Sequence, residues 1–171
     1  FDTIDFGSFV SPKAIPQMQD TAEVLERLDL SQTRSKLLAI IANTQGARLA
    51  SVHSEIQYLG FPFSISENFQ MRNTHKTIAE SLITLQEILE IADKSNKEVV
   101  AYLSMGFCKN YGDPWSGEIV GEWTEKMAVM GVKILSPSDT IGTSTPHVIS
   151  YLCSNLIPKY PDIQVGGHLH A

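Results

Sequence analysis

Two histidines near the end of the 171-residue sequence, His168 and His170, are its sharpest candidates for chemistry. They follow directly after a β-rich run that predicts a strand. If extended geometry continues, the two-residue period of a strand points both imidazoles to the same side. Two neutral imidazoles on one side can hold one metal ion. Taken alone, the pair also fits an unremarkable surface or capping pair.

Two aspartates are the candidate acidic groups. Asp139 follows the strand candidate 132–136, although an aspartate in such a turn is often only a helix cap or an Asx-turn. Asp5 lies inside the first strand candidate, where an ionised carboxylate is costly unless it is paired, hydrogen-bonded or metal-bound. Its apolar neighbours Ile4 and Phe6 predict that Asp5 points inward, while an outward register with solvent access stays open.

The cysteines and the other histidines give weaker signals. Cys153 shares an amphipathic helical pattern and is expected to pack in the core. Cys108 follows the strand candidate 98–104, but only Lys109 stands near it to lower the pKa of its thiol, so an inert thiol is expected. Three histidines in or beside helical patterns are assigned no role: His53, His75 and His147.

Short β-rich runs alternate with longer helical patterns, which is typical of βαβ units and a parallel sheet. Six strands are predicted, at 3–10, 36–42, 56–61, 98–104, 132–136 and 163–168. Helical patterns follow Asp20 and cover 46–54, 74–95, 116–130 and 145–156. The sequence contains no low-complexity segment and no Pro-, Gly- or Ser-rich linker, which favours a single domain over 1–171.

Two architectures fit six parallel strands with helices between them: an open doubly wound sheet, or part of a (β/α)₈ barrel. Both place function at the carboxyl ends of the strands. An open sheet usually carries a glycine-rich phosphate loop, and neither common pattern of that loop occurs here. The barrel is therefore favoured.

Composition narrows the partners and the compartment. A net charge of −6 without a run of basic residues argues against nucleic acid, so a small molecule is the expected partner. No apolar run approaches the roughly 20 residues that cross a bilayer, which predicts no membrane contact. Two cysteines match a reducing compartment such as the cytoplasm. The sequence opens inside a strand, so we expect it to be part of a longer protein.

Three segments together resemble the hydroxymethylglutaryl-CoA lyases. Ser8-Phe9-Val10-Ser11-Pro12-Lys13, continuing to Pro16-Gln17-Met18, is similar to the family's S-F-V-S-P-K-x-x-P-Q-M. The stretch 139–146 is similar to D-T-I-G-x-x-T-P, and His168-Leu169-His170 to H-x-H. Their order and spacing agree with the family over nearly the whole sequence. The resemblance implies an incomplete (β/α)₈ barrel with about six of its eight units.

The resemblance also implies an activity and a site. Members cleave 3-hydroxy-3-methylglutaryl-CoA to acetyl-CoA and acetoacetate by retro-Claisen chemistry with a divalent cation, here expected to be Mg²⁺ or Mn²⁺. On this basis His168 and His170 are metal ligands, and Asp139 transfers a proton at the substrate hydroxyl. Asp5 stands where the family has an acidic residue, usually Glu. Ser136 and Thr140 are expected to contact the acyl-CoA substrate or support the site.

The sequence also departs from the family. The arginine-aspartate pair of the family's first strand is not in it, nor are the cysteine and asparagine of the last strand region. Ala171 stands where many members have Asp. We therefore expect the isolated segment to be inactive.

Three alternatives remain beside the lyase. They are a Claisen-condensing isopropylmalate or homocitrate synthase of the same superfamily, a metal-dependent hydrolase of the amidohydrolase type, and a non-catalytic barrel remnant. In a hydrolase of that type the His-x-His pair belongs after the first strand, which argues against it. The mitochondrial matrix is the alternative compartment, and open sheet edges favour a homo-oligomer.

Overall fold

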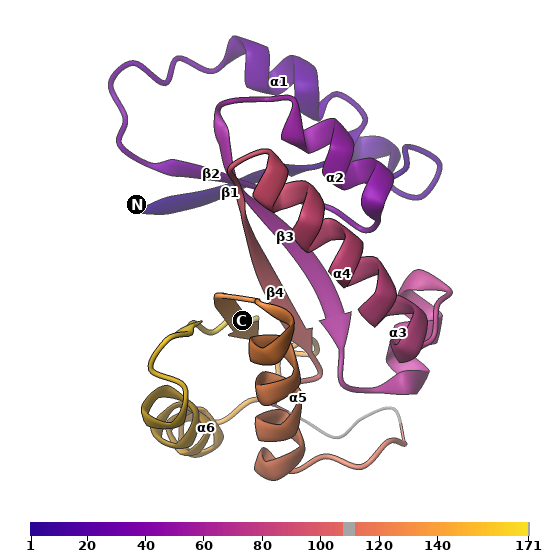
Figure 1. Ribbon diagram of the computed structural model, residues 1–171, viewed down its shortest axis with the longest axis vertical. Coiled ribbons are helices and arrows are strands. Elements are labelled where there is room, and N and C mark those ends of the chain that lie inside the picture. The colour runs from indigo at the N-terminus through magenta and orange to yellow at the C-terminus, as the bar shows by residue number, and fades with distance from the viewer. Residues whose placement is uncertain (108–111, 171) are drawn as a thin grey trace. The chain divides into compact units, whose positions relative to one another are not determined.

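The computed structural model describes residues 1–107 and 112–170. Its strands are β1 (Thr3–Ser8), β2 (Lys36–Ile40), β3 (Ile56–Ser64), β4 (Glu98–Ser104), β5 (Ile134–Pro137) and β6 (Gln164–Val165), of which β1 to β4 carry labels in Figure 1. Its helices are a 3₁₀ turn, η1 (Pro16–Met18), and α1 (Thr21–Arg27), α2 (Thr44–Ser51), α3 (Glu67–Thr74), α4 (Ile78–Lys94), α5 (Gly117–Met130) and α6 (Pro146–Lys159). Across the described ranges, no helix combines the length and apolar character that a membrane span requires.

The strands hydrogen-bond in chain order, β1-β2-β3-β4-β5-β6. The pairs β1–β2, β2–β3, β4–β5 and β5–β6 are parallel. The predicted parallel sheet of six strands with helices between them is therefore confirmed. The residues group into two compact units, Phe1–Phe61 with Glu87–Val99 and Pro62–Gln86 with Val100–Ala171.

In the first unit, strand β1 carries a bulge between Asp5 and Gly7. Asp5 pairs with Leu38 of β2, and Ser8 pairs with Ile40. Residues paired across neighbouring strands point to the same side of a sheet, and a bulge adds one residue to one strand. Asp5 and Ser8 therefore share one face of β1, although they lie three positions apart.

Lys97 stabilises the chain ahead of strands β3 and β4 in the first unit. Its Nζ donates to the carbonyl oxygens of His53 at 2.7 Å and Ile56 at 2.6 Å, and burial lowers the pKa of its ammonium group. Lys97→Met leaves both carbonyls without this donor, so we expect the free energy of unfolding to fall by about 1–3 kcal/mol in a denaturant titration. Lys94→Met, on the exposed side of α4, is the control and should change it by less than about 0.5 kcal/mol. Equal effects of the two variants would contradict this role of Lys97.

The predicted helix 74–95 is wrong at its start, because Thr74 ends α3 instead. His75 adopts the left-handed conformation, with φ 56°, that closes a helix. Helix α4 begins after Thr77, whose hydroxyl accepts from the Glu80 N–H at 3.1 Å while the Glu80 carboxylate accepts from the Thr77 N–H at 2.8 Å. This reciprocal capping box is the start signal that the apolar stripe alone did not reveal.

Helix α3 was not predicted, because it has no apolar stripe. Polar contacts of the buried Gln70 hold it in place. The Gln70 side-chain oxygen accepts from the Ser64 N–H at 2.7 Å, and its amide donates to Thr74 Oγ1 at 2.9 Å and Ser81 Oγ at 2.8 Å. A helix fixed in this way has no hydrophobic periodicity for sequence reasoning to find.

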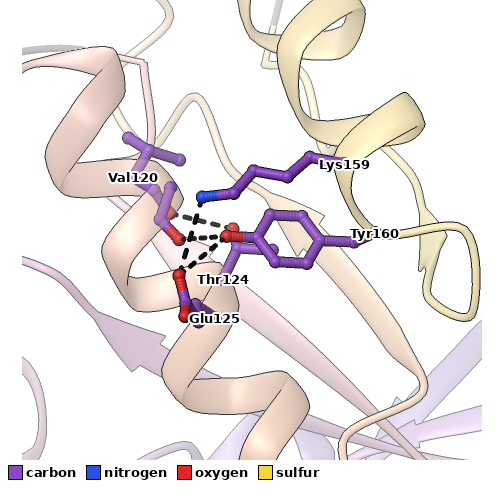
Figure 2. Close-up of polar contacts among 6 residues, drawn as sticks. Val120, Thr124, Glu125, Lys159 and Tyr160 are labelled. Atoms are coloured by element: carbon purple, nitrogen blue, oxygen red, sulfur yellow. Dashed lines mark hydrogen bonds and ion pairs between the residues drawn. The ribbon is translucent and has the colours of Figure 1, made fainter.

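Helices α5 and α6 of the second unit pack against each other (Figure 1). Figure 2 shows Lys159 and Tyr160, at the end of α6, reaching toward Glu125 of α5. The Tyr160 hydroxyl donates to the Gly121 carbonyl at 3.0 Å, and Lys159 Nζ lies 3.6 Å from Glu125 Oε2. These contacts anchor the end of α6, the helix that follows the Asp139 turn.

Candidate active site

The backbone of the second unit brings His168 beside the turn that carries Asp139. Strand β6 covers only Gln164–Val165 and not the predicted 163–168, because two glycines follow it and weaken the strand. Parallel pairing nevertheless resumes at His168. The His168 N–H donates to the Pro137 carbonyl at 3.0 Å, and the Asp139 N–H donates to the His168 carbonyl at 2.8 Å.

The imidazoles of His168 and His170 converge. Their Nε2 atoms lie 3.0 Å apart, and their ring centroids are 4.9 Å apart with the planes at 72°. Desolvation and the neighbouring His170 lower the pKa of His168, which favours the neutral ring that ligates a metal. The structure thus brings together the two residues that the sequence proposed as ligands.

The separation of the two nitrogens fits a shared cation. Imidazole nitrogens lie about 2.0–2.1 Å from a bound zinc ion, so two ligands of one such ion stand at most about 4.2 Å apart. The observed 3.0 Å falls within that span, although it also fits a direct hydrogen bond between the rings in one tautomer. Within the described residues, no third His, Cys, Asp or Glu completes a cluster with the pair.

Asp139 lies at the carboxyl end of β5 with only 1% of its surface exposed. One carboxylate oxygen accepts from the Thr143 N–H at 2.9 Å, and the other accepts from the Ser144 N–H at 2.9 Å and its hydroxyl at 2.6 Å. Burial raises the pKa of Asp139, but these donors and His170 outweigh it and hold the pKa below its ordinary value. Asp139 therefore braces the loop before α6, as aspartates in turns often do, and is ionised at neutral pH.

Ser136 and Thr140 flank Asp139 in different ways. Ser136 is buried in β5, opposite Tyr102 of β4. Thr140 Oγ1 accepts from the Met105 N–H at 2.8 Å, and Met105 has the unusual φ of 63°. Thr140 thus holds the turn after β4 against the Asp139 turn, since a left-handed non-glycine residue needs support from its surroundings.

Asp5 belongs to the first unit. Its side chain is exposed, as is that of Ile4, and partial desolvation raises the pKa of the Asp5 carboxyl. On the same face of β1, the Ser8 hydroxyl is buried and makes no hydrogen bond to any described residue. This face therefore carries one carboxylate and one unsatisfied hydroxyl.

Gly106 lets the turn after β4 approach the end of β5. A Cβ at this position would lie 2.8 Å from the Leu103 carbonyl oxygen and 3.1 Å from the Ser138 nitrogen. Gly106→Ala must push the backbone apart, so we expect it to lower the free energy of unfolding by about 1–3 kcal/mol. A thermal or denaturant melt would measure this fall in the free energy of unfolding.

Gly121→Ala is the matched control for Gly106→Ala. Gly121 lies inside α5, and a Cβ there meets nothing within 4 Å. Alanine should stabilise that helix by about 0.5–1 kcal/mol. A Gly106→Ala protein as stable as the parent would contradict the close approach.

Sequence reasoning overlooked two residues of this site. Ser144 supplies two of the three donors to Asp139, and the Tyr102 ring lies against His168 with centroids 5.2 Å apart. The strand register could have placed Tyr102 opposite Ser136, whereas nothing in the sequence signalled Ser144. Cys153 lies half-buried in α6, while Cys108 and Ala171 fall outside the described residues.

Comparisons with known proteins find hydroxymethylglutaryl-CoA lyases both among curated relatives and among solved structures. The chain is 33% identical over 173 residues to mitochondrial hydroxymethylglutaryl-CoA lyase from Macaca fascicularis, a match that covers 98% of this chain and 51% of that protein. The lyase structure from Bacillus subtilis has a TM-score of 0.89 at 29% identity and covers 99% of this chain and 56% of that one. No family model matches the sequence.

A third match was solved with ligands. The lyase from Acinetobacter baumannii, in complex with coenzyme A and 3-methylmalate, has a TM-score of 0.84 at 26% identity and covers 99% of this chain and 55% of that one. The chain spans about half the length of the curated relatives it matches. These matches confirm the predicted resemblance and the incomplete barrel.

Proposed function

We propose that this chain is the central part of a hydroxymethylglutaryl-CoA lyase. The whole protein is then proposed to cleave 3-hydroxy-3-methylglutaryl-CoA to acetyl-CoA and acetoacetate. The observation that carries the proposal is the pair of Nε2 atoms 3.0 Å apart, held by backbone hydrogen bonds beside the Asp139 turn. It occurs in a chain that is similar to these lyases along nearly its whole length. The Claisen-condensing synthases remain the closest rival.

His168 and His170 would hold the divalent cation, which we propose to be Mg²⁺ or Mn²⁺. Both rings present Nε2 toward each other, and the lowered pKa of His168 keeps that ring neutral near pH 7. When bound, such a cation acidifies the substrate alcohol and stabilises the negative charge that develops as the carbon–carbon bond breaks.

Asp139 is proposed to move the proton of the substrate hydroxyl. An ionised carboxylate offers about four lone-pair positions, and the loop donors occupy three of them. The remaining position has no donor among the described residues, and the proposal requires a substrate hydroxyl to reach it although only 1% of Asp139 is exposed. The lowered pKa keeps the carboxylate ionised but also makes it a weaker base, so the proposal relies on the cation to acidify the substrate hydroxyl.

Ser136, Thr140 and Asp5 are proposed as supporting groups. The Thr140 hydroxyl accepts from Met105, and its own proton lies in a weak 3.5 Å contact with the Ser138 carbonyl, so that proton can turn to a substrate oxygen. Ser136 offers a hydroxyl on β5, the strand that leads into the Asp139 turn. Asp5 is proposed only from its place in the family's pattern, where members have an acidic residue, and partial desolvation raises the pKa of its carboxyl.

The partner is proposed to be an acyl-CoA. The names of the relatives divide between mitochondrial and cytoplasmic forms, and we keep the cytoplasm as the proposed compartment with the mitochondrial matrix as the alternative. A homo-oligomer is proposed for this segment by itself, because open sheet edges favour association.

The test is an assay of the full-length protein with Mg²⁺ or Mn²⁺. We expect acetoacetate and acetyl-CoA to form from 3-hydroxy-3-methylglutaryl-CoA, and the reaction to stop when a chelator removes the cation. Condensation of acetyl-CoA with a 2-oxo acid, without cleavage, would assign the protein to the synthases. A full-length protein that binds neither cation would favour a non-catalytic remnant.

A further inference from the structure

The ring of Tyr102 lies edge-on against the ring of His168. Their centroids are 5.2 Å apart and their planes meet at 76°, a T-shaped arrangement that aromatic rings favour. Tyr102 lies in β4 and pairs with Ser136 of β5, whereas His168 follows β6. The two rings thus meet across an intervening strand.

Small residues between the two rings make this contact geometrically accessible. Neighbouring strands lie about 4.8 Å apart, so Tyr102 must pass over β5 to reach a residue that follows β6. The residue beneath its path is Ser136, and a Cβ on Gly166 would lie 3.9 Å from the Ser136 hydroxyl oxygen. A large side chain at either position would fill the space through which the Tyr102 ring passes.

The backbone and the ring of His168 are held by different contacts, and the contact with Tyr102 concerns the ring. Two hydrogen bonds to the β5 end fix the backbone of His168. Within the described residues, the ring nitrogens bond only to His170. Metal-bound histidines usually donate their second ring N–H to a carboxylate, carbonyl or water, which fixes the orientation of the ring. Among the described residues, packing against the Tyr102 ring takes the role of that hydrogen bond for the His168 ring.

We propose that Tyr102 is a positioning residue for the cation site: its ring sets the orientation of the His168 imidazole from two strands away. This inference rests on the proposed function, because it assumes that His168 ligates a cation. The aromatic ring is the part that acts, so phenylalanine should replace tyrosine here, whereas leucine should not.

The test measures Mn²⁺ affinity in the full-length protein by electron paramagnetic resonance, for Tyr102→Phe and Tyr102→Leu. We expect Tyr102→Phe to bind Mn²⁺ within about threefold of the parent, and Tyr102→Leu to bind about 10- to 100-fold more weakly. Tyr58→Leu is the matched control, because Tyr58 is a half-buried strand tyrosine whose hydroxyl accepts from Lys36 at 2.9 Å. It should leave Mn²⁺ affinity unchanged.

A second measurement does not need the cation. In the cation-free protein, the ring-proton NMR signals of His168 should move in Tyr102→Leu, which removes the ring current, and stay near their parent positions in Tyr102→Phe. Unmoved signals, or unchanged Mn²⁺ affinity in Tyr102→Leu, would overturn the inference while leaving the proposed function intact. Equal losses of affinity in both variants would also overturn it. A parent protein that binds no Mn²⁺ would overturn both.

Discussion

Replacing His168 or His170 with alanine is expected to abolish measurable Mn²⁺ binding and to reduce lyase turnover about a thousandfold or more. A bound cation contributes several kcal/mol of charge stabilisation in the transition state, and each 1.36 kcal/mol is about tenfold in rate. The two Nε2 atoms lie 3.0 Å apart, so losing either one removes half of the converging pair. Steady-state kinetics and a Mn²⁺ titration of the full-length protein measure the two effects.

His147→Ala is the matched control for the histidine pair, because His147 lies exposed in the first turn of α6. It should bind Mn²⁺ and turn over like the parent. Full turnover by His168→Ala or His170→Ala would exclude the pair as the cation site. If His147→Ala lost activity as well, general loss of structure would explain the result better than loss of a ligand.

Asp139→Asn is expected to lower kcat by about 10²- to 10⁴-fold, the usual contribution of a positioned acid or base. The amide cannot accept the substrate proton, and its NH₂ group would face a donor from Ser144 or Thr143 where the carboxylate had an acceptor. The expected loss of kcat therefore has two causes: the proton acceptor is missing, and the loop before α6 is held less firmly. Rates in the steady state and a denaturant melt are both needed.

Ser144→Ala separates these two contributions to the Asp139→Asn result. It removes the 2.6 Å hydroxyl donor but leaves the carboxylate and both N–H donors in place. If Asp139 transfers a proton, Ser144→Ala should retain most of the parent kcat while losing about 1.5–3 kcal/mol of stability. Equal losses of kcat in the two variants would mean that Asp139 acts only as a brace.

The arrangement of the strands was predictable from the sequence because β-rich runs and helical patterns alternate with different periods. That alternation placed His168 and Asp139 at strand ends, where the structure joins their backbones. Helix α3 was not predictable, because the polar contacts of Gln70 hold it, and such contacts leave no periodic signal.

The details of the site depended on contacts between segments distant in sequence. The sequence suggested two readings of Asp139, as an acid or base and as a brace. The hydrogen bonds from Thr143 and Ser144 became visible only once the loop had a conformation. The contact between Tyr102 and His168 likewise needs the register across β5, which hydrophobic alternation does not specify between strands 66 residues apart in the chain.

The bulge in β1 decides which side chains of this segment share a face of the sheet. If Phe6 entered the ladder as an ordinary strand residue, strict alternation would send Asp5 and Ser8 to opposite sides. Deleting Phe6 would instead regularise the ladder and keep the carboxylate and the buried hydroxyl on one face, two positions apart. Removing the extra residue therefore leaves the two groups together, whereas straightening the strand with Phe6 in place separates them.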